Sequence, residues 1–144
     1  MIPAKWLRHM NNLERPELFQ GRARWVRFSA KAEPRGCLIP FDFEKLPFPP
    51  RHAFIVRDVP ADTVRGRHAR RDTLQLIVCL AGALSVELRD AIRSETVVMD
   101  RPDTGLLISG GLWAAQTYLS PETIMLVFAS EPYNPEDYVD EPLA

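Results

Sequence analysis

The chain has 144 residues, of which 46% are hydrophobic and 26% charged, and its formal net charge is −1. This composition is that of one globular domain rather than of a disordered segment. The near-neutral charge gives no electrostatic reason to expect nucleic acid or an anionic membrane surface as a partner. No apolar run approaches the roughly 20 residues of a spanning helix, and the first ten residues lack the apolar core of a signal peptide. We therefore expect a cytoplasmic protein.

In chain order, the expected elements are mostly short strands. Near the N-terminus four apolar residues fall at helical spacing, before Pro16 would end a helix: Trp6, Leu7, Met10 and Leu13. Thirteen prolines and seven glycines divide the rest of the chain. Runs rich in β-branched and aromatic residues predict strands at residues 24–28, 36–39, 53–56, 74–80, 84–88, 95–99, 105–108, 112–119 and 123–128. In the tail, Asn134 can cap one helical turn that begins at Pro135.

The pattern within these runs predicts an all-β domain. Residues 84–88 alternate between apolar and polar, as in a strand with one wet face, whereas residues 76–80 and 124–128 are apolar throughout and should be covered on both faces. The spacing of the turns is typical of a sandwich or barrel. We place this domain, with a short C-terminal tail, at residues 35–144. Residues 1–34 are interpreted as an N-terminal extension that holds a short helix and an added strand.

The two cysteines, Cys37 and Cys79, each lie in an apolar run. Free cysteine packs as a small hydrophobic side chain, and disulfides are rare in reducing compartments. We expect both to be reduced core residues.

Residues 65–82 carry the spacing of the first cupin motif: His, one residue, His, a short gap, Glu, six residues and Gly. These positions hold His68, Arg70, Gln75 and Gly82, and the histidine position of the second motif falls on Ala114. A cupin metal needs several nitrogen or oxygen donors that converge on one point. Arginine stays protonated and repels a cation, and alanine has no donor. We therefore expect no metal, and a metal-dependent cupin such as a dioxygenase is the least favoured interpretation.

From about residue 35 to residue 138 the chain resembles the sugar-nucleotide 3,4-ketoisomerases, which are cupins that act on dTDP-4-oxo-6-deoxyglucose. The matching segments are residues 35–38, 47–48 with Arg51, 65–69, 75–80 with Gly82, 99–102, 105–106, 112–113, and 129–130 with Tyr133 and residues 137–138. The resemblance implies a single RmlC-like jelly-roll β-barrel that forms a homodimer. It also implies a nucleotide-sugar ligand and metal-free proton transfer through an enediol, which requires no cofactor.

The resemblance also implies residue roles. His68 matches the first histidine of a His-Ala-His pair that serves as base and acid in the family, and Arg70 stands in place of the second. Ala114 stands where the family has a histidine directly after the tryptophan that matches Trp113. We predict that His68 and Arg70 are catalytic, with His68 as acid and base. Arg70 and Arg65 would stabilise enediolate or diphosphate oxygens.

Further binding residues follow from strand alternation. If residue 114 faces the cavity, Gln116 and Tyr118 face it too, and Trp113 points away. The predicted substrate-binding residues are Arg65, Arg51, Gln75, Gln116 and Tyr118. Asp137 and Tyr138 should close the tail against the barrel.

Two functions stay open at this point. One is an active isomerase of a dTDP-hexose in deoxysugar and polysaccharide biosynthesis. The other is a catalytically impaired cupin that binds a sugar nucleotide or a partner protein without turnover.

Overall fold

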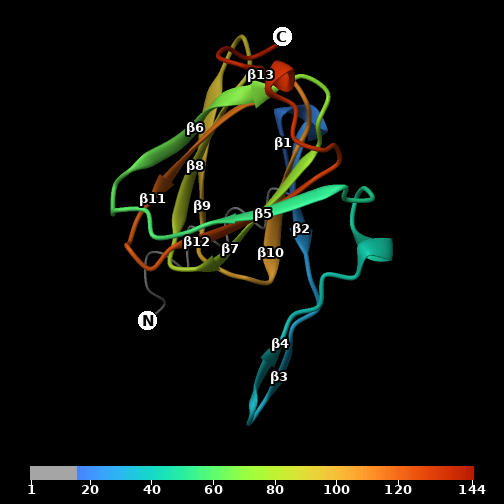
Figure 1. Ribbon diagram of the computed structural model, residues 1–144, viewed down its shortest axis with the longest axis vertical. Coiled ribbons are helices and arrows are strands. Elements are labelled where there is room, and N and C mark those ends of the chain that lie inside the picture. The colour runs from blue at the N-terminus through green and yellow to red at the C-terminus, as the bar shows by residue number, and fades with distance from the viewer. Residues whose placement is uncertain (1–15) are drawn as a thin grey trace.

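In a computed structural model, which describes residues 16–144, the chain forms two antiparallel β-sheets that face each other and a hairpin that projects from them (Figure 1). The six-stranded sheet contains, in spatial order, β1 (Glu17–Leu18), β2 (Ala23–Arg27), β10 (Thr104–Ile108), β7 (Gln75–Ala81), β12 (Ile124–Ala129) and β5 (His52–Val56). The five-stranded sheet contains β13 (Tyr138–Val139), β6 (Val64–Arg70), β11 (Trp113–Tyr118), β8 (Leu84–Arg89) and β9 (Ser94–Met99). The hairpin consists of β3 (Lys31–Glu33) and β4 (Gly36–Leu38). Three short 3₁₀ turns complete the described residues: η1 (Phe19–Gly21), η2 (Phe43–Lys45) and η3 (Pro135–Asp137).

The all-β prediction is confirmed. Each of the nine predicted runs holds a strand whose ends lie within one residue of those expected. Among the described residues, β1, β3, β6 and β13 were not predicted, because β1, β3 and β13 are only two or three residues long and β6 is mostly charged or small. No described helix is long and apolar enough to span a membrane.

The predicted helix at residues 6–13 lies outside the described residues. Within residues 1–34, β2 pairs with β10 from Ala23 opposite Ile108 to Arg27 opposite Thr104, so this strand belongs to the six-stranded sheet. The boundary between extension and domain at residues 34 and 35 stays a prediction.

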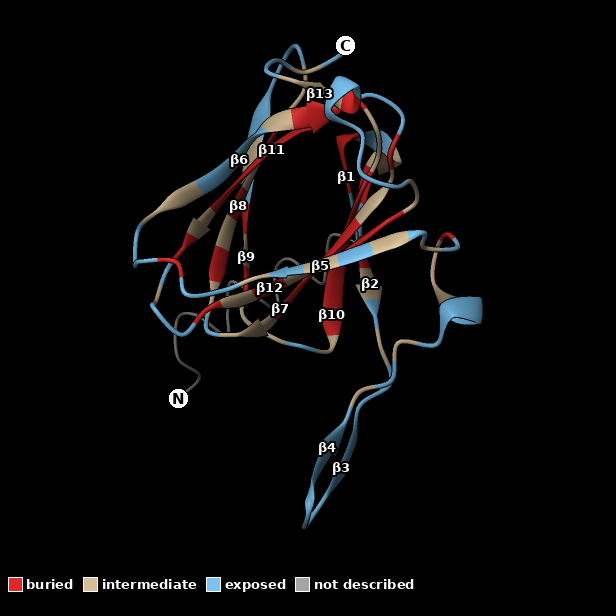
Figure 2. Cartoon of the chain, in the orientation of Figure 1, coloured by how far each residue is buried: buried red, intermediate tan, exposed pale blue. Residues whose placement is uncertain are grey.

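The main core fills the space between the two sheets, and a second core covers the outer side of the six-stranded sheet. Figure 2 shows buried residues on the strands of both sheets, whereas the projecting hairpin is exposed. Ile77 of β7 and Val127 of β12 face the main core, whereas Leu76 and Phe128 on the same strands face the second one. Residues 41–48 supply the outer cover through Phe41, Leu46 and Phe48. Both strands are thus covered on both faces, and β8 alternates between buried and half-buried residues, as predicted.

The expectation for the cysteines is correct at one position and wrong at the other. Cys79 is free and buried, with 1% of its surface exposed. Cys37 is free but exposed, because β4 lies in the projecting hairpin and all six strand residues of that hairpin are exposed.

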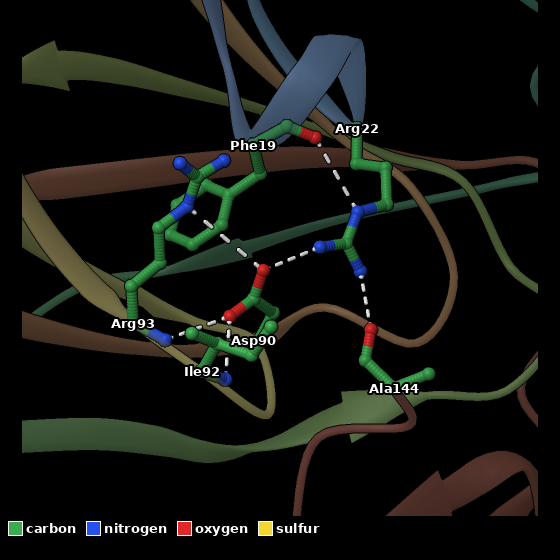
Figure 3. A network of polar contacts seen from close by, with 6 residues as sticks. All are labelled: Phe19, Arg22, Asp90, Ile92, Arg93 and Ala144. Atoms are coloured by element: carbon green, nitrogen blue, oxygen red, sulfur yellow. Dashed lines mark hydrogen bonds and ion pairs between the residues drawn. The ribbon is translucent and has the colours of Figure 1, made fainter.

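One arginine connects the start of β2 with two distant parts of the chain (Figure 3). Arg22 donates from Nη2 to the Asp90 carboxylate at 2.6 Å and from Nη1 to the carbonyl oxygen of Ala144 at 2.8 Å. Asp90 also accepts the backbone N–H groups of Ile92 and Arg93, which shapes the turn between β8 and β9. This network holds the C-terminal segment against the end of the barrel.

The turn between β7 and β8 depends on Gly82, and its replacement by alanine should destabilise the fold. Gly82 has φ +70°, and a Cβ there would lie 2.7 Å from the Cα of the buried Thr123 and closer still to its hydroxyl. We expect Gly82→Ala to lower the free energy of unfolding by more than about 2 kcal/mol, measured by urea denaturation. Gly36→Ala is the control, because Gly36 also has positive φ but a Cβ there meets nothing within 4 Å. Equal stability losses in the two variants would contradict this account.

Candidate functional site

A cavity of about 190 Å³ opens between the two sheets and carries polar groups mainly on one wall. The six-stranded sheet lines it with Phe54, Val56, Gln75, Ile77, Met125 and Val127. The five-stranded sheet lines it with Arg65, Gly66, His68, Ala114, Gln116 and Tyr138. A larger surface groove of about 800 Å³ runs between residues 71–73 and 131–137, but no histidine lines it. The smaller cavity, which combines an imidazole with neutral amides and a cation, is therefore the candidate site.

A β-bulge in β6 aims two charged or titratable side chains into this cavity. Ala114 of β11 pairs with His68, but the next residue, Ala115, pairs with Gly66, so Arg67 is the extra residue. Gly66 and Arg67 have φ of +83° and +63°. In a regular strand, residues 65 and 68 would face opposite sides of the sheet. Because the bulge adds one residue to β6, it shifts the alternation of side chains by one position. Arg65 and His68 therefore both face inward, while Arg67 lies on the outer face.

Glycine is required at position 66 because of its positive φ and also because a side chain would not fit there. A Cβ there would lie 2.7 Å from Oε1 of Gln116 and 3.1 Å from the carbonyl oxygen of Ala114. The bare backbone lets the Gln116 side chain lie across the bulge, where it lines the cavity.

His68 is held as a neutral imidazole. Its Nδ1 lies 3.1 Å from the carbonyl oxygen of Gly66. Burial lowers the pKa of His68 and is the largest cause; the Gly66 hydrogen bond raises it, the positive charge of Arg70 lowers it, and the Asp140 charge raises it least, with a net lowering. Because a carbonyl oxygen only accepts, we assign the hydrogen to Nδ1, which leaves a free lone pair on Nε2. Such a group can accept a proton near neutral pH.

The structure places Arg70 behind His68 rather than in the cavity lining. Arg70 is 3% exposed, and its Nε donates to the Asp137 carboxylate at 2.7 Å. Its Nη2 donates to the Thr73 hydroxyl at 3.2 Å. The guanidinium carbon lies 4.4 Å from the centre of the Tyr138 ring. Arg65 is therefore the guanidinium that lines the cavity, and a direct catalytic contact of Arg70 with a ligand stays a prediction.

The tail closes against the barrel, as predicted. Asn134 caps η3 by accepting the backbone N–H of Glu136, and β13 then pairs with β6. Burial by itself would raise the pKa of Asp137, but hydrogen bonds from Thr73, from the backbone of Asp72 and from Arg70 outweigh it and hold the pKa below its usual value. Asp137 is thus a charged anchor for the tail.

The remaining predicted binding residues divide into two groups. Gln75 and Gln116 line the cavity. Tyr118 is fully buried in the main core, where its hydroxyl donates to the carbonyl oxygen of Val56 at 3.1 Å and burial raises its pKa to about 12. Arg51 lies outside the cavity lining, with Nη1 3.2 Å from the carboxylate of the partly exposed Glu131. Direct contacts of Tyr118 and Arg51 with a ligand stay predictions.

Strand alternation correctly placed Trp113 on the outer face. Its Nε1 donates to the carbonyl oxygen of Asp140 at 3.0 Å, and the Arg89 guanidinium stacks 3.8 Å from its ring centre. Sequence analysis assigned Tyr138 only a structural role, although its side chain lines the cavity. The signal for this residue was its place in the matching tail, but its contact with His68 depends on the pairing of β13 with β6.

Known proteins match this chain over most of its length. The family model described as FdtA: WxcM-like, C-terminal, matches residues 22–143. The TDP-4-oxo-6-deoxy-alpha-D-glucose-3,4-oxoisomerase of Aneurinibacillus thermoaerophilus is 29% identical over 115 residues, which cover 79% of this chain and 83% of that protein.

Solved structures give the same picture. The sugar 3,4-ketoisomerase QdtA of Thermoanaerobacterium thermosaccharolyticum, in complex with TDP, matches with a TM-score of 0.80 and 25% identity over 83% of this chain and 88% of that one. A 3,4-ketoisomerase of Helicobacter canadensis matches with a TM-score of 0.79 and 28% identity, over 83% and 90%. The RmlC epimerase of Mycobacterium tuberculosis, 16% identical with a TM-score of 0.73 over 85% and 70%, shares the fold. The predicted RmlC-like jelly-roll is therefore confirmed.

Asp137→Asn should destabilise the protein because it leaves the buried Arg70 guanidinium without its counter-charge. We expect a loss of about 3–5 kcal/mol in the free energy of unfolding at pH 7. The folded pKa of Asp137 lies below its ordinary 3.8. The stability that the Asp137 carboxylate contributes is therefore fully present above its ordinary pKa of 3.8, and it is lost as the pH falls through the folded pKa. The variant has no carboxylate at this position, so it should not show this loss of stability on acidification.

Denaturant unfolding of both proteins from pH 7 to pH 3 measures the effect. Glu136→Gln is the matched control, since Glu136 is an exposed carboxylate in the same turn, and its stability should change by less than about 0.5 kcal/mol. A similarly small change for Asp137→Asn would rule out the anchoring role.

Proposed function

This chain belongs to the family FdtA: WxcM-like, C-terminal, and on that premise we propose that it is a 3,4-ketoisomerase of a TDP-linked 4-oxo-6-deoxyhexose, in deoxysugar biosynthesis for a polysaccharide or similar glycoconjugate. The curated relative bears the name of this activity. Solved relatives that are 25–28% identical are 3,4-ketoisomerases, and one of them was solved with TDP. A nucleotide sugar is accordingly the proposed ligand.

The reaction needs proton transfer and no external oxidant or reductant. The C3 hydrogen is acidic because the C4 ketone is adjacent. A base removes this proton, the electron pair of the C3–H bond forms a C3–C4 double bond, and the C4 oxygen becomes an enediolate oxygen. The C3 hydroxyl proton then passes to the C4 oxygen. A proton delivered to C4 leaves the ketone at C3, so the product is an isomer of the substrate.

The observation that carries this proposal is the neutral His68 in the cavity wall. Its Nδ1 is occupied by the Gly66 carbonyl, so Nε2 is free to remove the C3 proton and, as imidazolium, to return it to C4. One histidine is sufficient if both transfers occur on the same face of the enediol. This matters because Ala114, the residue paired with His68, has no proton to give.

The neighbours of His68 supply the complementary charges. Arg65 shares its cavity wall and can stabilise the enediolate oxygens or the diphosphate. Gln75 and Gln116 offer neutral donors and acceptors that suit sugar hydroxyls. The residues that β5 and β12 contribute to the same cavity are all apolar.

His68→Asn should reduce isomerisation by roughly 10²–10⁴-fold, because the amide cannot act as a base, while the affinity for TDP should stay nearly unchanged. Incubation with dTDP-4-oxo-6-deoxyglucose in D₂O, followed by NMR, detects both the 3-oxo product and deuterium at C4. His52→Asn is the matched control. His52 is the other histidine of the described residues, half-buried on β5 and outside the cavity lining, and its loss should leave the rate unchanged. Full activity of His68→Asn would remove His68 from the mechanism.

The same assay tests the non-catalytic alternative. If the wild-type protein binds TDP but yields neither product nor deuterium exchange, it is a binding module rather than an isomerase.

We also propose that the protein needs no metal or other cofactor. In residues 16–144, no group of three or more His, Cys, Asp or Glu side chains could hold a metal ion. The proposed chemistry uses only proton transfer by His68. We expect full activity after dialysis against EDTA and less than stoichiometric metal in the purified protein. Stoichiometric iron, zinc or manganese whose removal abolishes activity would contradict the proposal.

The proposed assembly is a cytoplasmic homodimer. Strand β5 forms one edge of the six-stranded sheet, and its Ile55 is 55% exposed. The projecting hairpin carries Leu38, which is 61% exposed. Open strand edges and exposed apolar side chains favour association with a second copy. Light scattering should give the mass of two chains, and the mass of one chain would contradict the dimer.

A further inference from the structure

Three side chains from two strands contact one another at the cavity wall: His68 and Tyr138 line the cavity, and Arg70 does not. The Tyr138 ring contacts both Arg70 and His68: the Arg70 guanidinium carbon is 4.4 Å from its centre, and the Tyr138 and His68 rings form a T-shaped pair with centroids 4.7 Å apart. Tyr138 and Arg70 are also direct partners in the pairing of β13 with β6. We propose that Arg70 is a positioning residue for the proposed isomerase, which acts through Tyr138 to fix the His68 ring and places a buried positive charge on the same strand, two residues from His68.

Hydrogen bonds hold the Arg70 side chain in place. Two of the three guanidinium nitrogens of Arg70 are bound, Nε to Asp137 and Nη2 to the Thr73 hydroxyl. Asp137 accepts in addition the backbone N–H of Asp72 at 2.9 Å. A planar guanidinium held at two corners presents a fixed face to the ring above it. Tyr138 is thus held between its backbone pairing and this face, which leaves the edge contact with His68 little freedom.

The groups around His68 also determine its pKa. The charges that act on its pKa are Arg70 from its own strand and Asp140 from the tail. Arg65 of the same strand is the charged residue that shares its cavity wall. The cavity-lining residues of β5, β7, β11 and β12 are all neutral. Burial and the Arg70 charge lower the pKa of His68 more than the Gly66 carbonyl and Asp140 raise it. Loss of the Arg70 charge should therefore raise the pKa of His68.

Arg70 is poorly placed to contact a ligand itself. It is almost fully buried, it is absent from the cavity lining, and Tyr138 covers its face. Its effect on the proposed reaction, which this inference takes as given, should consequently pass through His68. A substitution should change kcat and its pH profile rather than KM.

The charge component is tested by NMR titration of the His68 Hε1 resonance, assigned by comparison with His68→Asn. Arg70→Gln would leave Asp137 buried without its partner, so the main variant is the double substitution Arg70→Gln with Asp137→Asn, which replaces the ion pair by a neutral pair. We expect the pKa of His68 to rise and the acidic limb of kcat/KM to move to higher pH by the same amount. The matched control is Arg71→Gln, which removes an exposed positive charge from the next residue. It should leave the titration unchanged.

The positioning component is tested by Arg70→Lys, which keeps the charge but lacks the planar face. We expect the pKa of His68 to stay low and kcat to fall between roughly tenfold and a hundredfold with little change in KM. Tyr138→Leu should lower kcat similarly. The double variant Arg70→Lys with Tyr138→Leu should lose no more than either single variant, because both act through one contact.

The outcomes separate this inference from the proposed function. An unchanged His68 titration in the neutral-pair variant, or full kcat in Arg70→Lys, overturns the role of Arg70 even in an active enzyme. The titration needs no turnover. A raised pKa in a protein without isomerase activity would therefore keep the electrostatic control of His68 and reject only the isomerase.

Discussion

The candidate site depends on one departure from regular strand geometry. A β-strand turns successive side chains to opposite faces, so residues three positions apart cannot both face one cavity. The bulge at Gly66 and Arg67 removes this restriction and brings Arg65 and His68 to the same wall. Both bulge residues have positive φ, and Arg67 has no glycine-like freedom to reduce the cost. The pairing of β6 with β11 and β13 on its two sides holds this conformation in place.

The ion pairs of the molecule differ widely in what they contribute. Arg51 with Glu131 is solvent-exposed on both sides and should contribute little to stability. Arg70 with Asp137 is almost completely buried, and each partner has further hydrogen bonds that compensate for lost water. Removal of one partner of such a pair is costly because the other charge remains. The tail is therefore connected to the barrel by a contact that stabilises strongly but tolerates little substitution.

The sequence predicted the parts of the fold that follow from local pattern. Apolar runs located the central strands, and alternation along β11 placed Trp113 outside and Gln116 inside. The strand that carries His68 was not predicted, because Val64–Arg70 contains three arginines, a glycine and a bulge, and long-range pairing forms it. The sequence did not indicate the ion-pair partner of Arg70 either, because Asp137 lies 67 residues away. Cys37 shows the opposite error: an apolar run predicted burial, but the run lies in a hairpin that no sheet covers.

The shortness of β13 has a consequence for how the molecule loses activity on heating. This strand joins the five-stranded sheet through two residue pairs, and the buried contact of Asp137 with Arg70 supplies much of the remaining attachment, so loss of this one contact can free the tail while the sheets stay paired. Detachment of the tail would remove Tyr138 and the counter-charge of Arg70 while leaving the cores between and outside the sheets intact. Such sub-global opening requires less free energy than complete unfolding. Thermal inactivation should therefore begin below the temperature at which the β-sheet signal melts, with the tail as the first segment open to proteases.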